Sequence, residues 1–201
     1  MKIASHLLLA VLTITACSPV SAAEQRAVFA GGCFWGVEAV FEHVRGVIDV
    51  KSGYAGGTKE TANYDAVTTG ETKHAESVEI RFDPAKITYE QLLKIFFEVA
   101  HNPTELNRQG PDIGAQYRSA IFYADETQKA AAEAFIEKMK PSKAFSKPIV
   151  TEVVPLKEFF AAENYHQDFM KKNPDHPYIV YHDVPKVTAL KIQFPEFYVG
   201  K

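Results

Sequence analysis

A short apolar run that ends in two glycines and passes into a helical repeat places the strongest constraint on how this chain folds. Ala27-Val28-Phe29-Ala30 is typical of a strand, and Gly31-Gly32 breaks it. Apolar side chains then recur at helical spacing as far as Gly46, at Phe34, Val37, Val40, Phe41 and Val44. The pattern therefore predicts that Cys33 lies where a strand turns into a helix.

The rest of the chain alternates between strand and helix patterns. Period-two alternation predicts strands from Val47 to Tyr54 and from Ser77 to Phe82, joined by a long loop rich in Gly, Thr and Asn. Thr88 and Gln91 form a capping box ahead of a helix that runs to about His101. The remaining predicted elements are a strand over 119–123, a helix over 125–139, a strand over 149–154, a helix over 157–172 and a short tail helix over 186–194, to which we assign no chemistry.

This order of elements, β-α-β-β-α-β and then α-β-α, predicts an α+β fold. We expect a two-layer sandwich with a ferredoxin-like core and a C-terminal α-β-α extension. The 201 residues, 46% of them hydrophobic, suffice for one core, and no linker or repeat divides the chain. We therefore expect a single domain over residues 24–201. The net charge of −3, without a patch dense in Lys or Arg, argues against nucleic-acid binding.

The first 23 residues differ in composition from the rest and predict an export signal. Met1-Lys2 gives a positive start, and an apolar run and small residues follow. A buried N-terminal helix is disfavoured because no capping signal or amphipathic face is present. Cleavage follows Val20-Ser21-Ala22, or Ile14-Thr15-Ala16-Cys17 acts as a bacterial lipoprotein box; the sequence favours neither. We expect an exported, periplasmic protein that is attached to the membrane only if Cys17 carries lipid.

Either maturation route leaves Cys33 as the one thiol of the mature protein, because the sequence has only two cysteines. A thiol in the first turn of a helix meets unpaired N–H groups and the positive end of the helix dipole, which favour the thiolate. Phe34 and Trp35 offer aromatic faces that suit a methyl group or thioether. The alternative is that Cys33, Phe34 and Trp35 are core residues in a tight turn.

Polar residues around two loops could serve such a thiol. Tyr64 and Glu76 flank the long loop, and Asp112 and Tyr117 precede a later strand. An Asp in a turn or a Tyr near a strand end is structural more often than functional, so only the combination is informative. Glu163-x-x-His166 has the spacing of a metal site but lacks the second pair that such sites need. No zinc or nucleotide motif is present either, so we expect no metal and no nucleotide.

These residues resemble the peptide methionine sulfoxide reductases of the A type, whose signature Gly-Cys-Phe-Trp-Gly is here Gly32 to Gly36. The resemblance extends from about residue 26 to 185. It includes Gly53-Tyr54-Ala55-Gly56-Gly57, His74-Ala75-Glu76, Leu106-Asn107-Arg108-Gln109-Gly110, Gln116-Tyr117-Arg118-Ser119 and Asn164-Tyr165-His166-Gln167-Asp168. Chance agreement over so many ordered segments is implausible.

The resemblance implies an oxidoreductase that repairs oxidised proteins by reducing the S epimer of methionine sulfoxide, free or in peptides. Cys33 would attack the sulfoxide sulfur and become a sulfenic acid, and Glu76 would protonate the oxygen. The other implied participants are Tyr64 and Tyr117, which assist that proton transfer, Asp112, which organises the site, and Phe34 and Trp35, which hold the substrate methyl group.

The sequence departs from many relatives because no cysteine follows Cys33, whereas they carry C-terminal cysteines that resolve the sulfenic acid. The resemblance then implies no bound cofactor and an external reductant, either a thioredoxin-like protein or a small thiol. Two alternatives use the same residues. One is an exported protein that only binds oxidised methionine, which would not need the thiol, and the other is a thiol peroxidase, which does not explain the Phe-Trp pair.

Overall fold

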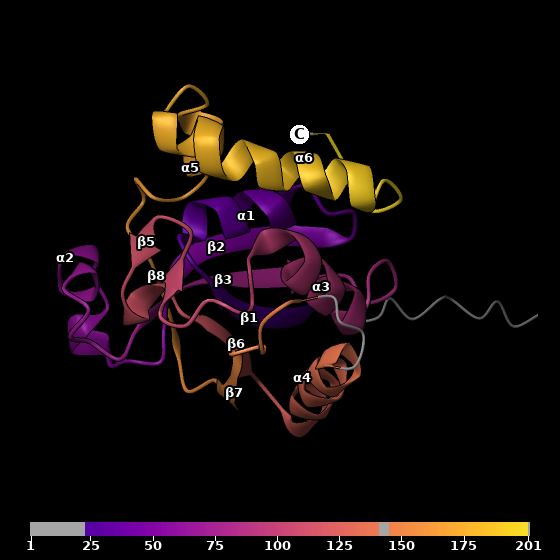
Figure 1. Ribbon diagram of the computed structural model, residues 1–201, viewed down its shortest axis with the longest axis horizontal. Coiled ribbons are helices and arrows are strands. Elements are labelled where there is room, and N and C mark those ends of the chain that lie inside the picture. The colour runs from indigo at the N-terminus through magenta and orange to yellow at the C-terminus, as the bar shows by residue number, and fades with distance from the viewer. Residues whose placement is uncertain (1–22, 141–144, 201) are drawn as a thin grey trace, which may run out of the picture.

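A mixed sheet of six strands, in the order β7-β6-β1-β3-β2-β8, runs through the described part of the molecule (Figure 1). The computed structural model describes residues 23–140 and 145–200. The predicted signal therefore lies, apart from its last residue, outside the described residues, and so does Cys17. Within the described ranges, no helix is both long enough and apolar enough to cross a bilayer.

The strands and helices have the following bounds. The sheet consists of β1 (Gln25–Gly31), β2 (Val47–Ala55), β3 (Ala75–Phe82), β6 (Ser119–Tyr123), β7 (Glu152–Pro155) and β8 (Phe159–Ala161). Two further strands, β4 (Arg108–Gln109) and β5 (Asp112–Ile113), form a separate hairpin. The α-helices are α1 (Phe34–Glu42), α2 (Tyr64–Thr68), α3 (Tyr89–Ile95), α4 (Glu126–Met139), α5 (Phe169–Lys172) and α6 (Val184–Gln193). Shorter helical segments are η1 (Lys59–Thr61), η2 (Phe96–Ala100), η3 (Ala115–Tyr117) and η5 (Ile179–Asp183).

The four central strands confirm the predicted core. In the order β6-β1-β3-β2, each pairs antiparallel with its neighbours, and α1 and α3 form the two connections of a β-α-β-β-α-β unit. Alternate residues of β1 face opposite sides of the sheet. Phe29 belongs to the large core beneath the helices, whereas Val28 belongs to a smaller apolar cluster. The α+β fold class predicted from the sequence is therefore confirmed.

The capping box and the tail helix are also confirmed. The Thr88 side chain accepts a hydrogen bond from the N–H of Gln91, whose side chain accepts one from the N–H of Thr88. The tail helix α6 begins two residues before the predicted start and lies along α1 (Figure 1). The long loop after β2 is not fully irregular, because it contains η1 and α2.

The helix predicted over 157–172 is wrong. Phe159–Ala161 instead form β8, which pairs antiparallel with β2, and only Phe169–Lys172 are helical. The side-chain amide of Gln167 accepts a hydrogen bond from the N–H of Ser52 and donates one to its carbonyl, as a further strand would. Pairing with the open edge of β2 therefore overrides the local helical pattern.

Candidate active site

Cys33 is the N-cap residue of α1, and one residue, Gly32, separates it from the end of the central strand β1. Its side chain is buried and only 8% exposed. Gly32 has a φ of 94°, and a Cβ there would lie 2.5 Å from Cγ of Gln109 on β4. Only glycine adopts this conformation without strain and leaves room for that approach. The hairpin β4–β5 therefore packs directly against the turn that presents Cys33.

Glu76 lies at the same end of the sheet, near the start of β3. Its Oε2 accepts a hydrogen bond of 3.0 Å from the backbone N–H of Phe34, the residue after Cys33. Burial raises the pKa of Glu76 to about 8, and this effect outweighs the N–H bond, which lowers it. The carboxyl group is thus mostly protonated at neutral pH and can donate a proton.

Two groups of effects act in opposite directions on the pKa of Cys33. Burial first, then the charges of Glu76 and Asp183, raise the pKa of the Cys33 thiol well above its usual value. The hydrogen bond from the Trp35 N–H and the charge of Lys186 lower the pKa, as expected of a helix start. Because the raising effects are larger, the resting residue is a thiol, although the helix start favours the thiolate as the sequence predicts.

Two tyrosines on separate elements interact electrostatically with Glu76 and Cys33. Burial and the charges of Glu76 and Cys33 raise the pKa of Tyr64, at the start of α2. Burial and the charges of Glu76 and Asp112 raise the pKa of Tyr117, in η3. Both hydroxyls therefore keep their protons at neutral pH and can donate hydrogen bonds. The structure brings together both tyrosines, Cys33 and Glu76, as the sequence predicts.

Asp112 joins this group through the hairpin. It lies on β5 opposite Gln109, the residue that packs on Gly32. The hydroxyl of Tyr178 donates a short hydrogen bond to Oδ2 of Asp112, and burial raises the pKa of Tyr178. The C-terminal segment thus holds the hairpin over the Cys33 turn.

Phe34 and Trp35 lie among aromatic rings. Phe34 is 1% exposed, and its ring centroid is 4.9 Å from that of His166. The Trp35 ring stacks on Phe169 at 3.6 Å and meets Tyr178 edge-on at 5.8 Å. Phe34 is thus also a core residue, and contact of either residue with substrate stays a prediction.

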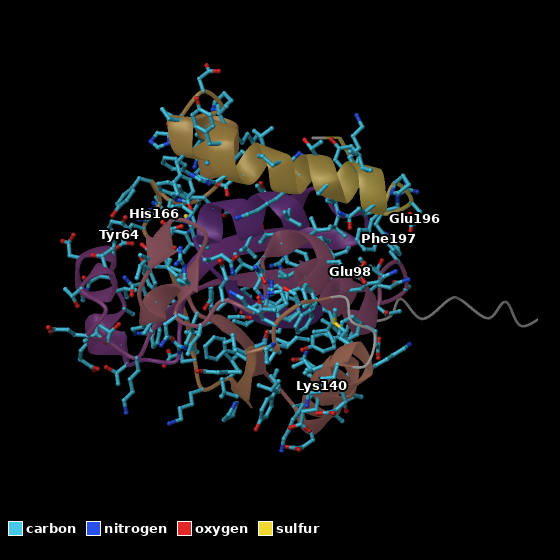
Figure 2. All side chains as sticks on the ribbon, in the orientation of Figure 1. Tyr64, Glu98, Lys140, His166, Glu196 and Phe197 are labelled. Atoms are coloured by element: carbon cyan, nitrogen blue, oxygen red, sulfur yellow. The ribbon has the colours of Figure 1, made fainter. Side chains whose placement is uncertain are left out.

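His166 is a site residue that sequence reasoning missed. Its Nδ1 accepts a hydrogen bond of 3.0 Å from Nε1 of Trp35, so its proton is on Nε2, which is buried without a partner in the described structure. Its ring centroid is 4.5 Å from that of Tyr64, and the two side chains lie together in Figure 2. The sequence signals were the Glu163-x-x-His166 spacing and the segment from Asn164 to Asp168 that shares the family resemblance, and neither assigned His166 a role.

Glu163 links the segments that carry Tyr54 and Tyr64. One carboxylate oxygen accepts a hydrogen bond from the Tyr54 hydroxyl, and the other accepts one from the Tyr64 N–H. Among residues 23–140 and 145–200, no group of three or more His, Cys, Asp and Glu side chains is arranged to hold a metal ion. Asp183 and Lys186, which also act on Cys33, were missed because the tail carries no recognisable motif.

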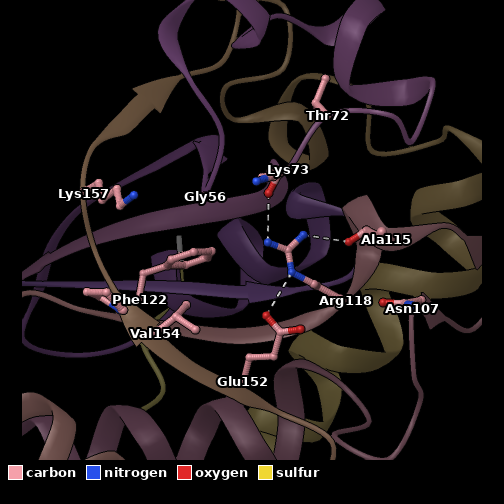
Figure 3. A pocket seen from close by; sticks show the side chains of 11 residues that line it. Gly56, Thr72, Lys73, Asn107, Ala115, Arg118, Phe122, Glu152, Val154 and Lys157 are labelled. Carbon is pink, nitrogen blue, oxygen red and sulfur yellow. Dashed lines mark hydrogen bonds and ion pairs between the residues drawn. The ribbon is translucent and has the colours of Figure 1, made fainter.

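Arg118 ties the two site-bearing loops together outside the catalytic group. Its guanidinium donates hydrogen bonds to the carbonyls of Lys73, His74 and Ala115, and Nε pairs with Glu152 at 3.3 Å (Figure 3). It thereby fixes the chain next to Glu76 and Tyr117. The cavity of about 490 Å³ that Arg118 lines is separate from the Cys33 site, because none of the site residues described above contributes to its wall.

Comparison with known proteins gives concordant matches. The family model described as "Peptide methionine sulfoxide reductase" matches residues 25–197. Peptide methionine sulfoxide reductase MsrA 2 of Mesorhizobium japonicum is 56% identical over 177 residues, which cover 88% of this chain and 91% of the relative. The structure of reduced Mxr1 from Saccharomyces cerevisiae is 34% identical, with a TM-score of 0.72, and the match covers 76% of this chain and 87% of that one. Mxr1 in complex with Trx2 is 24% identical, with a TM-score of 0.52 and coverage of 77% and 91%, and supports the fold alone.

Proposed function

We propose how this chain, which belongs to the peptide methionine sulfoxide reductase family and is an oxidoreductase acting on methionine sulfoxide, carries out its reaction. It reduces the S epimer, and Cys33 becomes a sulfenic acid that an external thiol then reduces. The observation that carries this mechanism is the position of Glu76. A carboxyl group that keeps its proton at neutral pH lies one hydrogen bond from the residue after Cys33. A thiol and a proton donor are the two groups that sulfoxide reduction needs.

Proton donation to the sulfoxide oxygen is the first requirement, because the sulfur is a poor electrophile while the oxygen is unprotonated. Glu76 supplies this proton, and the hydroxyls of Tyr64 and Tyr117 donate hydrogen bonds to the same oxygen. Phe34 and Trp35 hold the substrate methyl group, and Asp112 organises the site. The electrostatic coupling of both tyrosines to Glu76 and Cys33 supports these roles.

The sulfur chemistry then follows in balanced steps. The Cys33 thiol loses its proton and its sulfur bonds to the sulfoxide sulfur, whose oxygen takes up the proton of Glu76. The S–O bond and the new S–S bond then break as the hydroxyl oxygen moves to the cysteine sulfur, so that methionine departs, Cys33–SOH remains and the thiol proton returns to Glu76. The cysteine sulfur is oxidised by two electrons and the substrate sulfur is reduced by two. One external thiol attacks the sulfenic sulfur, releasing water and forming a mixed disulfide. A second external thiol restores the Cys33 thiol and leaves with the first as a disulfide.

The reductant is a thioredoxin-like protein or a small thiol, and no bound cofactor is needed. The sequence supports this assignment because no cysteine follows Cys33. The solved complex of Mxr1 with Trx2 is a precedent for such a partner within the same fold. The substrates are oxidised proteins or peptides and free methionine sulfoxide. The predicted N-terminal signal supports a periplasmic location, with attachment to the membrane only if Cys17 carries lipid.

An epimer-resolved assay tests the proposal. With dithiothreitol as reductant, the enzyme should convert the S epimer and leave the R epimer, and Cys33→Ser should be inactive. Activity that survives this substitution would exclude Cys33 as the nucleophile. Mass spectrometry after one turnover should find Cys33 as a sulfenic acid or mixed disulfide. An intramolecular disulfide would contradict the single-cysteine cycle.

A further inference from the structure

Asp183 and Lys186 form a buried charge pair at the start of α6. Oδ1 of Asp183 is 3.1 Å from Nζ of Lys186. Asp183 is fully buried, and the Lys186 side chain is 20% exposed. Oδ2 of Asp183 is also buried and has no hydrogen-bond partner among the described residues. Removing two charges from water costs free energy, so the burial of this ion pair needs an explanation.

The pair lies directly against the first turn of α1. A Cβ at Gly36 would be 2.0 Å from Oδ1 of Asp183 and 2.7 Å from Nζ of Lys186. Gly36 is three residues after Cys33 on the same helical turn. The missing side chain at Gly36 therefore lets a carboxylate and an ammonium group approach the backbone that presents the catalytic sulfur.

The charged groups around Cys33 indicate what the Asp183–Lys186 pair does. Two acidic side chains raise the pKa of Cys33 when they are ionised, those of Glu76 and Asp183, and Lys186 is the one cation among the described residues found to lower it. The other groups that face the site are the hydroxyls of Tyr64, Tyr117 and Tyr178 and the carboxylate of Asp112. When Glu76 gives its proton to the sulfoxide, it becomes an anion beside a sulfur that is losing its own proton. A fixed cation is needed most at that step.

We propose that Asp183 and Lys186 are positioning residues for the reaction. Asp183 holds the Lys186 ammonium beside the start of α1, and the ammonium stabilises negative charge on the Cys33 sulfur. This inference rests on the proposed function, since it concerns the attacking form of Cys33. Asp183 also places a negative charge near the sulfur. The two residues therefore act on Cys33 with opposite sign, which separates their electrostatic role from a packing role.

The test measures the rate at which iodoacetamide alkylates Cys33 as a function of pH, because only the thiolate reacts. The full chain carries Cys17→Ser, so that Cys33 is its only thiol. Lys186→Met should move the midpoint to higher pH and slow alkylation below the midpoint about tenfold, which corresponds to one pKa unit. Asp183→Asn keeps an oxygen for Lys186 but removes the charge, and should speed alkylation. Lys186→Arg should keep the original midpoint.

Circular dichroism of each variant establishes that it is folded. An unchanged midpoint in Lys186→Met, or shifts of the same sign in Lys186→Met and Asp183→Asn, would overturn the proposal. Steady-state kinetics with dithiothreitol give a second readout: Lys186→Met should lower kcat about tenfold and leave KM unchanged, and Lys186→Arg should restore kcat. Because alkylation requires no sulfoxide turnover, failure of this inference can be told from failure of the proposed function.

Discussion

At the scale of single residues, the proton on Glu76 has the greatest consequence for activity. Burial raises the pKa of this carboxyl to about 8, so the group is a proton donor below that pH and an acceptor above it. In the proposed mechanism the opposite requirement applies to Cys33, which needs to lose its proton to attack. A rise in pH therefore favours the role of Cys33 and disfavours that of Glu76.

The rate should rise with pH as Cys33 loses its proton, and should level off above about pH 8, because Glu76 then loses the proton that it donates. In Glu76→Gln, kcat/KM should drop by about 10²–10⁴ and the break near pH 8 should disappear. Measurement of kcat/KM against pH checks this, because this ratio reports the pKa values of the free enzyme. Glu79→Gln on the same strand, where the native residue pairs with Arg26, is the matched control. A break near pH 8 that persists in Glu76→Gln would assign it to another group.

The same raised pKa also makes the stability of the protein depend on pH. Between the ordinary pKa of 4.5 and about 8, the folded state binds a proton that the unfolded chain has lost, so stability falls as pH rises through this range. Glu76→Gln removes this loss and keeps an oxygen for the Phe34 N–H. Its melting temperature, relative to the native protein, should be higher at about pH 8 than at about pH 5. A difference that does not depend on pH would contradict the raised pKa.

At the scale of elements, α1 shows how closely its neighbours constrain it. A helix-interior Gly→Ala substitution ordinarily stabilises a helix by roughly 0.5–1 kcal/mol. At Gly36 the added Cβ would meet Asp183 at 2.0 Å.

Gly36→Ala should therefore destabilise the protein by about 1–3 kcal/mol, because the α6 end must shift to relieve the clash. Urea unfolding checks this value. Gly200→Ala is the control, because nothing lies within 4 Å of its added Cβ. A Gly36→Ala protein as stable as the native one would mean that the start of α6 moves freely.

The elements that the sequence predicted are those with a local signal. The glycine pair before Cys33, the alternation of β3 and the capping box at Thr88 act within a few residues, and each is found in the structure. The segment over 157–172 has helical apolar spacing, but its backbone pairs with β2, far away in the sequence. Such a pairing leaves no local pattern, so the wrong helix could not be avoided from sequence periodicity alone.

At the scale of the whole molecule, the site depends on contacts between distant segments. The signature around Cys33 and the residues Glu76, Tyr64, Tyr117 and Asp112 were predicted because they lie in recognisable motifs. Tyr178 and the charge pair were missed, and His166 received no role although it lies in a recognised segment, since these roles arise only when the C-terminal segment folds over α1 and the hairpin. The raised pKa of Cys33 was missed for the same reason, because burial is a property of the assembled core.

The proposed export of the molecule leads to a prediction about its mature form. Isolated from a bacterium that exports it, the protein should begin after Ala22, or at a lipid-bearing Cys17. In both cases Cys33 is the remaining free thiol. The mass of the N-terminal peptide distinguishes the two forms. A mature protein that still carries residues 1–16 would contradict export by either route.

The stacking of Trp35 on Phe169, with its hydrogen bond to His166, also makes the enzyme its own optical reporter. The chain contains a single tryptophan, so all of its indole fluorescence originates beside the reacting sulfur. Oxidation of Cys33, arrival of a sulfoxide or docking of a reductant changes the surroundings of that one ring. Each step of the cycle can therefore be timed by stopped-flow emission without attaching a dye.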